Sequence, residues 1–238
     1  MFFLLLCMAC LSPQQPVADP SVIALGRDLF KQHLSAIGGR TALMAHSSLT
    51  MHGRLRRISN PLEHRFVTWK QAPSSIQTQI DIVGLGTVER GYDGETGWER
   101  TVSQVTQLPE ENLDLQKRSA DFYFDANDEL WYPRIVTVQD AEFAGRPCRS
   151  VQTVNSFGER EDVYFEKESG LKMGSARFTE RDEEPIWTRF GHYVLIDDLR
   201  MPLSIEEITG EEKKLILIQE VSWDNVLDRI KAPDGMPE

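Results

Sequence analysis

Cys10 is the residue whose position points most directly to chemistry. It follows an uncharged apolar run, residues 1–9, that ends in the small residue Ala9, and a polar stretch rich in proline comes after it. The run is too short to span a bilayer, which needs roughly 20 residues, and is typical of the end of an export signal. A small residue directly before a cysteine matches a bacterial lipoprotein cleavage site, where the cysteine becomes the acylated N-terminus. This pattern predicts lipidation of Cys10.

The leader departs from that pattern at two points. No Lys or Arg precedes the apolar run, and Cys7 stands three positions before Cys10, where lipoprotein signals usually have Leu. A cleaved secretion signal without a lipid is one alternative, and a cytoplasmic protein with an unusual N-terminus is another. The favoured interpretation is a periplasm-facing protein of the bacterial cell envelope. Leu11, rather than Asp, after Cys10 favours anchoring in the outer membrane.

Cys148 is the one further cysteine in the sequence. If Cys10 is acylated, Cys148 has no partner, and the fold is expected to form without disulfides. A Cys10–Cys148 bridge is the alternative if Cys10 carries no lipid. The C-x-x-C spacing of Cys7 and Cys10 lies in the leader and not near a βαβ unit, which argues against a redox motif.

The residue types that most often carry catalysis or hold metals are scattered along the chain. No histidine forms an H-E-x-x-H motif, and no Cys/His pair has zinc spacing. A nucleophile elbow, a P-loop and a dinucleotide-binding glycine motif are also missing from the sequence. We therefore predict no catalytic residue, no metal site and no cofactor, and a hydrolytic enzyme is the least favoured class. The histidines are His33, His46, His52, His64 and His192.

Carboxylates alternate over residues 125–129, as they do in a calcium loop. Leu130 stands where that loop requires Gly, and Val136 stands where it requires Glu. We predict an ordinary polar loop here. The charged stretches 159–162 and 180–185 are predicted to be solvated turns between strands.

Composition sets the class of protein. The chain has 238 residues, of which 40% are hydrophobic and 26% charged, as in ordinary globular proteins. That length is enough for a sizeable core in one large domain. The formal net charge of −11 argues against nucleic acid, whose phosphates need a basic surface. It also argues against electrostatic docking on anionic lipid, so membrane attachment is expected to come from the acyl anchor.

The sequence predicts three helices in addition to a tether. Residues 10–20 contain prolines and glutamines and are predicted to be a flexible tether. Ser21 is the predicted cap of a first helix, whose apolar residues recur at helical spacing until Gly38-Gly39 ends it. A short second helix is expected over 41–46. A third is expected in the first half of residues 109–124, ending near Ala120.

From residue 49 onward the apolar period changes to two. Ile76, Ile80 and Ile82 alternate with polar residues, which predicts a strand with one face toward a core. Turn signals separate about ten or eleven such strands, and their short loops imply antiparallel pairing. These strands are expected among twelve candidate stretches: 49–58, 65–71, 76–82, 87–92, 98–105, 135–142, 148–154, 162–166, 171–178, 186–193, 203–208 and 215–223.

These strands predict a mainly β, α+β fold. Each strand has one apolar face, and two helical segments are too few to cover so wide a sheet. We expect a single curled antiparallel sheet that forms an unclosed half-barrel, with the N-terminal and mid-chain helices over its concave face. A partly covered concave face can hold an apolar ligand. Trp98, Phe122, Phe124 and Trp131 are the predicted lining of this cavity, with core packing as the alternative for each.

Short motifs along the chain add a family resemblance. In order, they are Gly38-Gly39, Gly91-Tyr-Asp-Gly94 with Gly97-Trp98, Glu168-Ser-Gly-Leu171, Arg200-Met-Pro-Leu203 and Trp223-Asp-Asn225. Over about residues 21–233 the chain resembles the LolA/LolB-like lipoprotein-carrier superfamily, in the branch of outer-membrane lipoprotein-sorting-like proteins. The resemblance implies a half-barrel plugged by helices and an apolar cavity for acyl chains. No individual ligand residue carries over.

The resulting expectation is an export signal at 1–9, a tether at 10–20 and a half-barrel domain at 21–238. The resemblance implies a non-enzymatic protein that binds an acyl chain or other lipophilic group, in lipoprotein or lipid trafficking. Expected partners are the acyl chain or lipoprotein cargo, the membrane through the lipid anchor, and an envelope protein. The alternative is an envelope scaffold or interaction module, in which large residues such as Trp69, Trp98 and Trp187 fill the barrel.

Overall fold

A computed structural model describes residues 18–60, 62–179, 184–225 and 228–233. The export signal, Cys10 and most of the tether fall in residues 1–17, outside the described residues. Most of the charged stretch at 180–185 also lies outside them. In the described part of the chain, no helix is both long enough and apolar enough to cross a membrane.

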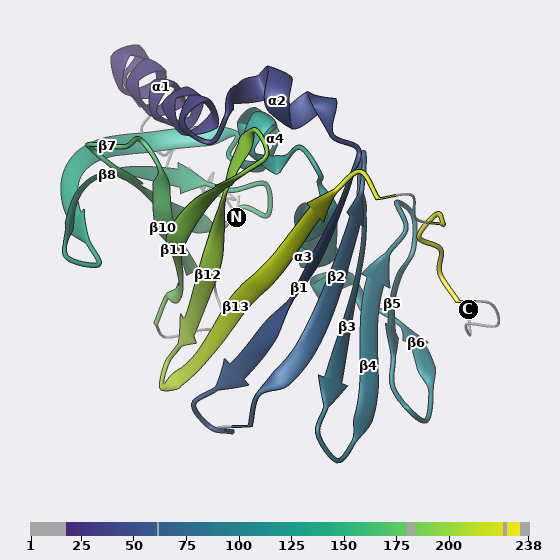
Figure 1. Ribbon diagram of the computed structural model, residues 1–238. Coiled ribbons are helices and arrows are strands. Elements are labelled where there is room, and N and C mark those ends of the chain that lie inside the picture. The colour runs from purple at the N-terminus through teal and green to yellow at the C-terminus, as the bar shows by residue number, and fades with distance from the viewer. Residues whose placement is uncertain (1–17, 61, 180–183, 226–227, 234–238) are drawn as a thin grey trace, which may run out of the picture.

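One antiparallel sheet of thirteen strands makes up the body of the described structure (Figure 1). The spatial order is β6-β5-β4-β3-β2-β1-β13-β12-β11-β10-β9-β8-β7, so the first and last strands in sequence pair at its centre. The strands are β1 Ser48–Arg57, β2 His64–Gln71, β3 Ser75–Ile82, β4 Gly86–Tyr92, β5 Gly97–Arg100, β6 Val105–Gln107, β7 Arg134–Phe143, β8 Arg146–Val154, β9 Arg160–Glu166, β10 Lys172–Phe178, β11 Ile186–Ile196, β12 Leu199–Thr209 and β13 Glu212–Trp223.

The predicted mainly β half-barrel is confirmed, although the strand count was too low. The stretch predicted as one strand over 98–105 is two strands, β5 and β6. Thr101 N–H donates to the Gln104 carbonyl at 2.8 Å and closes a hairpin turn between them. Because this turn contains neither Gly nor Pro, the usual signal for a chain reversal is missing from the sequence.

Within the described residues, five helical segments accompany the sheet: α1 Pro20–Ala36, α2 Gly39–Ala45, α3 Glu110–Ala120, the 3₁₀ turn η1 Phe124–Ala126 and α4 Asp128–Trp131. The cap of α1 is Asp19 rather than the predicted Ser21. Its carboxylate accepts the Ser21 N–H at 2.8 Å, and Pro20 occupies the first turn, where its missing N–H has no consequence. The expected polar loop at 125–129 is instead wound into η1 and α4.

Gly38 separates α1 from α2 at a place that only glycine can occupy. Its φ is +130°, and an added Cβ would lie 2.4 Å from the Asp198 carbonyl oxygen. The close approach positions the start of α2 at the β11–β12 turn. Next to it, the Arg200 N–H of β12 donates to the Ile37 carbonyl at 2.8 Å. The Gly-Gly helix end seen in the sequence therefore also fixes how the helices meet the sheet.

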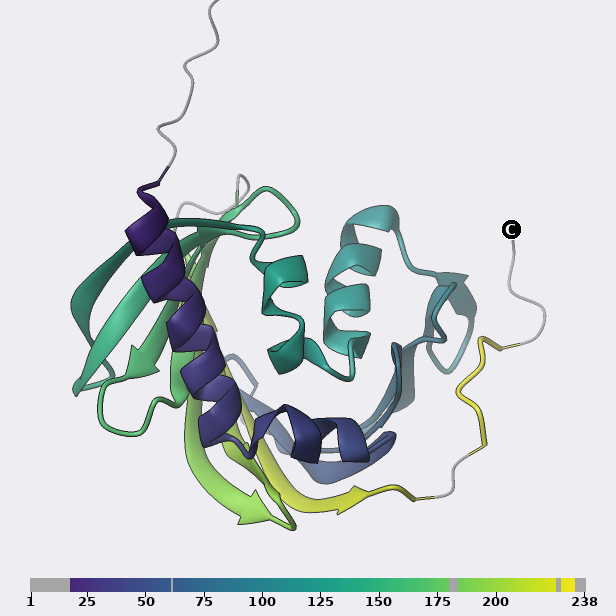
Figure 2. The same ribbon diagram turned by 90° about the horizontal axis from the view of Figure 1, so that it is seen from above.

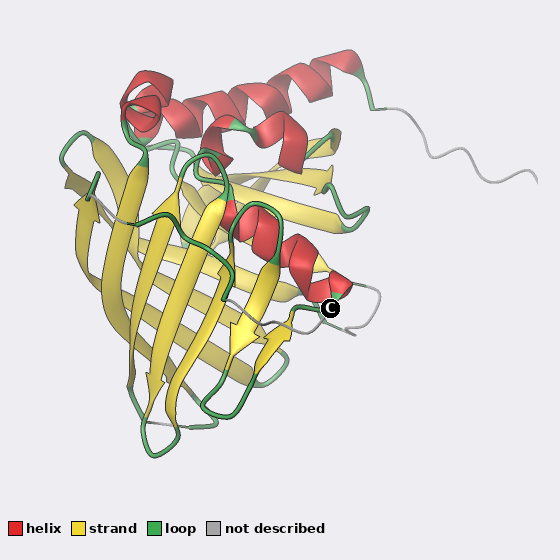
Figure 3. Ribbon diagram, turned by 90° about the vertical axis from the view of Figure 1, so that its right-hand side faces the viewer, coloured by secondary structure: helices red, strands yellow, loops and turns green. Residues whose placement is uncertain are grey.

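The helices occupy two places relative to the curled sheet. Seen from above, α3 and α4 lie inside its curve, whereas α1 and α2 run along one end of the strands (Figures 2 and 3). Leu113 and Ala120 of α3 pack on Ile76 and Tyr92 of β3 and β4. The helix therefore serves as an internal plug that rests against one flank of the half-barrel.

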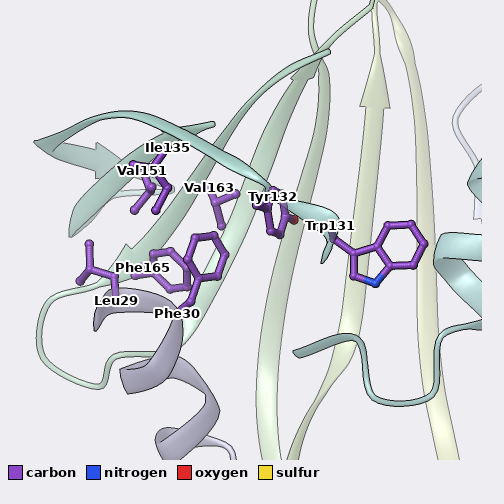
Figure 4. Close-up of a cluster of buried hydrophobic side chains, with 8 residues drawn as sticks. All are labelled: Leu29, Phe30, Trp131, Tyr132, Ile135, Val151, Val163 and Phe165. Carbon is purple, nitrogen blue, oxygen red and sulfur yellow. The ribbon is translucent and has the colours of Figure 1, made fainter. Parts of the chain in front are cut away.

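The opposite flank is filled by a hydrophobic core (Figure 4). Phe30 of α1 packs with Phe165 of β9 at a ring distance of 5.1 Å and with Tyr132 at 5.0 Å. Val151 and Val163 from β8 and β9 are fully buried beneath them. The cluster comprises Leu29, Phe30, Trp131, Tyr132, Ile135, Val151, Val163 and Phe165.

Candidate functional site

The strand registers define which side chains line the concave face. Ile76 contacts α3, so its pairing with Lys70 places Lys70 on the same inner face. Paired residues in an antiparallel sheet point to one side, and every second residue along a strand does so too. Following these pairs across the centre of the sheet gives an inner row that includes Phe66, Ile80 and Ile218.

Apolar side chains cover the centre of this face, and the helices leave many of them only partly buried. Leu55, Phe66 and Ile218 are buried, each with 7% of its surface exposed. Around them stand side chains that are only partly buried: Met51, Ile80, Leu203, Ile205, Ile216 and Val221. We call these nine residues the inner apolar face. It differs from the opposite flank, where α1, α4 and their aromatic residues complete the packing.

Three of the four predicted cavity residues lie together on the link between α3 and β7. Trp131 packs into the filled flank, and its indole N–H donates to the Asp121 carboxylate at 2.6 Å. Phe124 stacks on Trp131 with the ring centroids 6.1 Å apart. Phe122 meets Trp223 of β13 edge to face at 6.4 Å, which brings it to the upper end of the concave face.

Trp98 is not brought together with these residues. It pairs with Gly91, and its ring lies over that glycine, where an added Cβ would come within 2.1 Å of it. Tyr92, the next residue along β4, faces α3, so Trp98 lies on the convex side of the sheet. Its indole N–H donates to the Glu89 carboxylate at 3.0 Å, and its side chain is fully buried.

A buried ion pair joins the plug to the filled flank. The Arg118 guanidinium of α3 contacts the Glu161 carboxylate of β9 at 2.8 and 3.0 Å, and it donates to the Tyr132 hydroxyl at 2.6 Å. Burial opposes ionisation of Glu161, but the Arg118 charge and hydrogen bonds outweigh it and lower the pKa of this carboxyl. Since α3 also packs on β3 and β4, the helix connects the two flanks.

Lys70 is a polar feature of the concave face that sequence reasoning missed. Its ammonium donates to the Asp121 carbonyl at the C-terminal end of α3, at 3.0 Å. Burial lowers the pKa of Lys70 to about 8, against the opposing charges of Asp121 and Asp125. The position favours a cation at a helix C-terminus. Period-two alternation with Phe66 and Thr68 was the available signal for its inward orientation.

The groups that could do catalysis lie elsewhere. His46 bridges the carboxylates of Asp224, at 2.6 Å, and Asp198, at 2.9 Å, on the outside of the fold. The nearby Ser47 hydroxyl contacts Asp224 and not the imidazole, so the group lacks a serine–histidine contact. Among the described residues no cluster of His, Cys, Asp and Glu has a metal-binding arrangement. Cys148 is buried and free.

A recess of about 600 Å³ lies between α1 and the turn that joins β9 to β10. Its lining is mainly polar and includes Asp28, Gln32, Lys167 and Ser169. It is separate from the inner apolar face, and its charged walls suit water better than a hydrocarbon chain.

The comparisons with known proteins bear on the fold. No family model matches the sequence, and no curated protein matches it. Among solved structures, a LolA superfamily protein from Nitrosomonas europaea is similar with a TM-score of 0.62 and 10% identity, covering 88% of this chain and 98% of that one.

Two further solved structures have a similar fold. A putative outer membrane lipoprotein-sorting protein domain from Vibrio parahaemolyticus has a TM-score of 0.61 and 8% identity, covering 86% of this chain and 94% of its own. A DUF1329 family protein from Desulfovibrio piger has a TM-score of 0.61 and 12% identity, with coverages of 89% and 96%. The described chain therefore has the fold of the LolA superfamily, an unclosed β half-barrel around internal helices.

Proposed function

We propose that this protein binds an acyl chain or another lipophilic group on the inner apolar face, and that it does so without catalysis. The observation that carries the proposal is that Met51, Ile80, Ile205 and Ile216 are only partly buried inside the curve of the sheet. Exposed apolar surface of this kind is stabilised when a hydrocarbon covers it. Burial contributes about 0.8 kcal/mol per CH₂ group.

The solved structures support the same proposal. One similar fold is named a LolA superfamily protein and another a putative lipoprotein-sorting domain. A role in lipoprotein or lipid trafficking in the bacterial envelope is consistent with both names. Phe122 is the predicted aromatic residue best placed to contact such a ligand, because it lies at the upper end of the concave face beside Trp223.

Adjacent residues of β13 offer a matched test. Ile216 pairs with Leu55 and faces inward, whereas its neighbour Leu217 faces outward with 39% of its surface exposed. We expect the Ile216→Glu variant to bind a fluorescent fatty-acid probe at least about tenfold more weakly, a loss of about 1.4 kcal/mol. Leu217→Glu should leave probe binding unchanged.

A second variant separates loss of binding from loss of folding. Leu203→Trp adds apolar volume on the same face, so we expect a folded protein with weakened probe binding. Circular dichroism and the Tm report folding for each variant. Equal probe binding by all variants, or none by the parent protein, would contradict the proposal. A parent protein that captures an envelope protein in fixed stoichiometry and no lipid would instead select the scaffold alternative.

The proposal includes an envelope location and an N-terminal anchor. We propose that residues 1–9 are removed as an export signal, that Cys10 is acylated, and that residues 10–20 tether the half-barrel at residues 21–238 to the outer membrane. Mass spectrometry of protein extracted from bacterial membranes should show a lipid-modified Cys10, together with bound lipid. An unmodified N-terminus with the leader retained would argue against the anchor and leave the ligand proposal standing.

A further inference from the structure

Loops lie at the end of the half-barrel away from α1 and α2 (Figures 1 and 3), and they carry a group of exposed apolar side chains. They lie on the loops that join β1 to β2, β3 to β4 and β5 to β6. Their exposed fractions are 65% for Ile58, 49% for Leu62, 61% for Val83, 72% for Leu85 and 73% for Val102. We call these five residues the apolar rim.

The three loops are neighbours along one edge. Their strands are consecutive in the sheet, from β6 to β1. An added Cβ at Gly86 would lie 2.8 Å from a Val102 methyl carbon, so the β3–β4 and β5–β6 loops are in contact. The Ile58 N–H donates to the Lys213 carbonyl at 2.8 Å, which holds the β1–β2 loop against the hairpin of β12 and β13.

Such a grouping is unusual in the described chain. The other exposed apolar side chains are distributed singly over separate elements, such as Leu25 on α1 and Leu195 on β11. Single exposed apolar residues are common on soluble proteins, whereas a group of them marks a site of interaction. Of the five most exposed apolar side chains, only Leu130 lies outside the rim.

Basic residues accompany the rim. Residues 54–65 contain four arginines and one glutamate, although the whole chain has a net charge of −11. Arg54 pairs with Glu63 at 2.8 Å. Arg56, Arg57 and Arg65 are exposed, and within the described residues they form no ion pair. The β3–β4 and β5–β6 loops, residues 83–85 and 101–104, carry no charge. Residues 54–65 are therefore locally basic in an acidic chain.

We propose that the apolar rim docks on the surface of a bilayer that contains anionic lipid, with its aliphatic side chains in the interfacial region and the nearby arginines on lipid phosphates. Apolar groups on a projecting surface combined with basic residues are what peripheral membrane binding requires. Guanidinium groups match phosphate geometry. Protein interfaces favour aromatic anchors, and the rim has none.

Docking at this edge has a geometric consequence. The inner apolar residues nearest the rim are Ile82, Leu55 and Ile216, on β3, β1 and β13. A bilayer at the rim would lie beside this end of the inner apolar face. Docking goes beyond the proposed function, because it requires no ligand on that face.

The test uses the full chain with Cys10→Ser, so that no acyl anchor contributes to binding. We expect this protein to co-sediment with vesicles of phosphatidylethanolamine and phosphatidylglycerol. We expect Leu85→Asp with Val102→Asp to weaken vesicle binding at least about tenfold. The matched control is Leu130→Asp with Leu195→Asp, at residues that are 61% and 58% exposed elsewhere. It should bind as the parent does.

A charge test addresses the arginines. Arg56→Glu with Arg57→Glu should weaken binding to phosphatidylglycerol vesicles by about fivefold or more for each charge, and much less when the vesicles contain only zwitterionic lipid. The control is Arg134→Glu, an exposed arginine of β7 for which no ion pair is found in the described chain. Its binding should remain within about twofold of the parent, a difference of about 0.4 kcal/mol.

The proposal is overturned if the parent chain does not sediment with vesicles. It is also overturned if each control variant weakens binding as much as the rim or arginine variant that it matches. It is also overturned if the rim pairs leave vesicle binding intact and instead abolish self-association in light scattering. Fatty-acid probe binding, measured without vesicles, reports folding of the rim variants. It also separates a failure of docking from a failure of the proposed ligand site.

Discussion

At the residue scale, the contact with the largest consequence is the buried pair of Arg118 and Glu161. Their side chains are 14% and 3% exposed, and Tyr132 and Asn155 complete the hydrogen bonding. Two charges removed from water are tolerated because each satisfies the other. Either charge left alone would be strongly unfavourable. The pair is therefore expected to matter more when one member is removed than when both are replaced.

We expect Glu161→Ala to lower the free energy of unfolding by about 3–5 kcal/mol, since it leaves the Arg118 charge buried and uncompensated. Glu63→Ala removes an exposed pair with Arg54 and should cost no more than about 1 kcal/mol. Urea denaturation measures both. Replacing both buried members, as Arg118→Met with Glu161→Leu, should recover much of the loss. A double variant less stable than Glu161→Ala would show that the pair itself stabilises the fold.

At the element scale, His46 connects α2, the β11–β12 turn and the end of β13, at the end of the sheet that carries α1 and α2. It follows α2, and its imidazole contacts Asp198 in the β11–β12 turn and Asp224 just after β13. It also stacks on Trp223 with the rings 4.6 Å apart. Partial burial disfavours the charged imidazole, but the hydrogen bonds and charges of the two aspartates outweigh it and raise the pKa of His46.

Because the pKa of His46 is raised, the stability that its contacts with Asp198 and Asp224 contribute depends on pH, and the sign of that dependence is defined. A raised folded-state pKa means that the contribution of His46 is complete below the unfolded value of about 6.5 and is lost as the pH rises through the higher folded value. We expect His46→Gln to lower the Tm more at about pH 5.5 than at about pH 8.5. The Tm of the variant is compared with that of the wild type at each pH. This comparison cancels the opposite pH effect of His33, whose buried imidazole has a lowered pKa. An equal loss of Tm at both pH values would show that the charged His46 imidazole does not stabilise the fold through the two aspartates.

At the scale of the whole molecule, one flank of the half-barrel is packed more completely than the centre of its sheet. Aromatic residues of α1, η1 and α4 fill the flank of β7, β8 and β9. The centre of the sheet presents Leu203, Ile205 and Ile216 only partly covered. The residues that fill the flank of β7, β8 and β9 do not include Trp69, Trp98 or Trp187, which the plugged-barrel alternative named. The ligand-binding proposal rests on the centre of the sheet. The plug connects the two flanks through Leu113 on one side and Arg118 on the other.

The sequence by itself determined the class of fold and the place of most elements. Period-two patterns located the strands, and short turns required antiparallel pairing. Pro109 and the acidic residues after it located α3, whose end at Ala120 is confirmed. These features are local, since a turn or a capped helix depends on residues close together in the chain. The cap of α1 was misplaced by two residues because Asp19 and Ser21 both suit that position.

Only the tertiary structure decided which faces point inward and which residues meet. Leu215 to Ile218 are apolar at four consecutive positions, so alternation could not choose a face, and the pairing of Ile216 with Leu55 did. The same registers placed Trp98 on the convex side. The rim joins loops from residues 58 to 102, and its local positive charge is hidden in a net charge of −11. Pairing between distant strands sets these features, and no short window of sequence contains both partners.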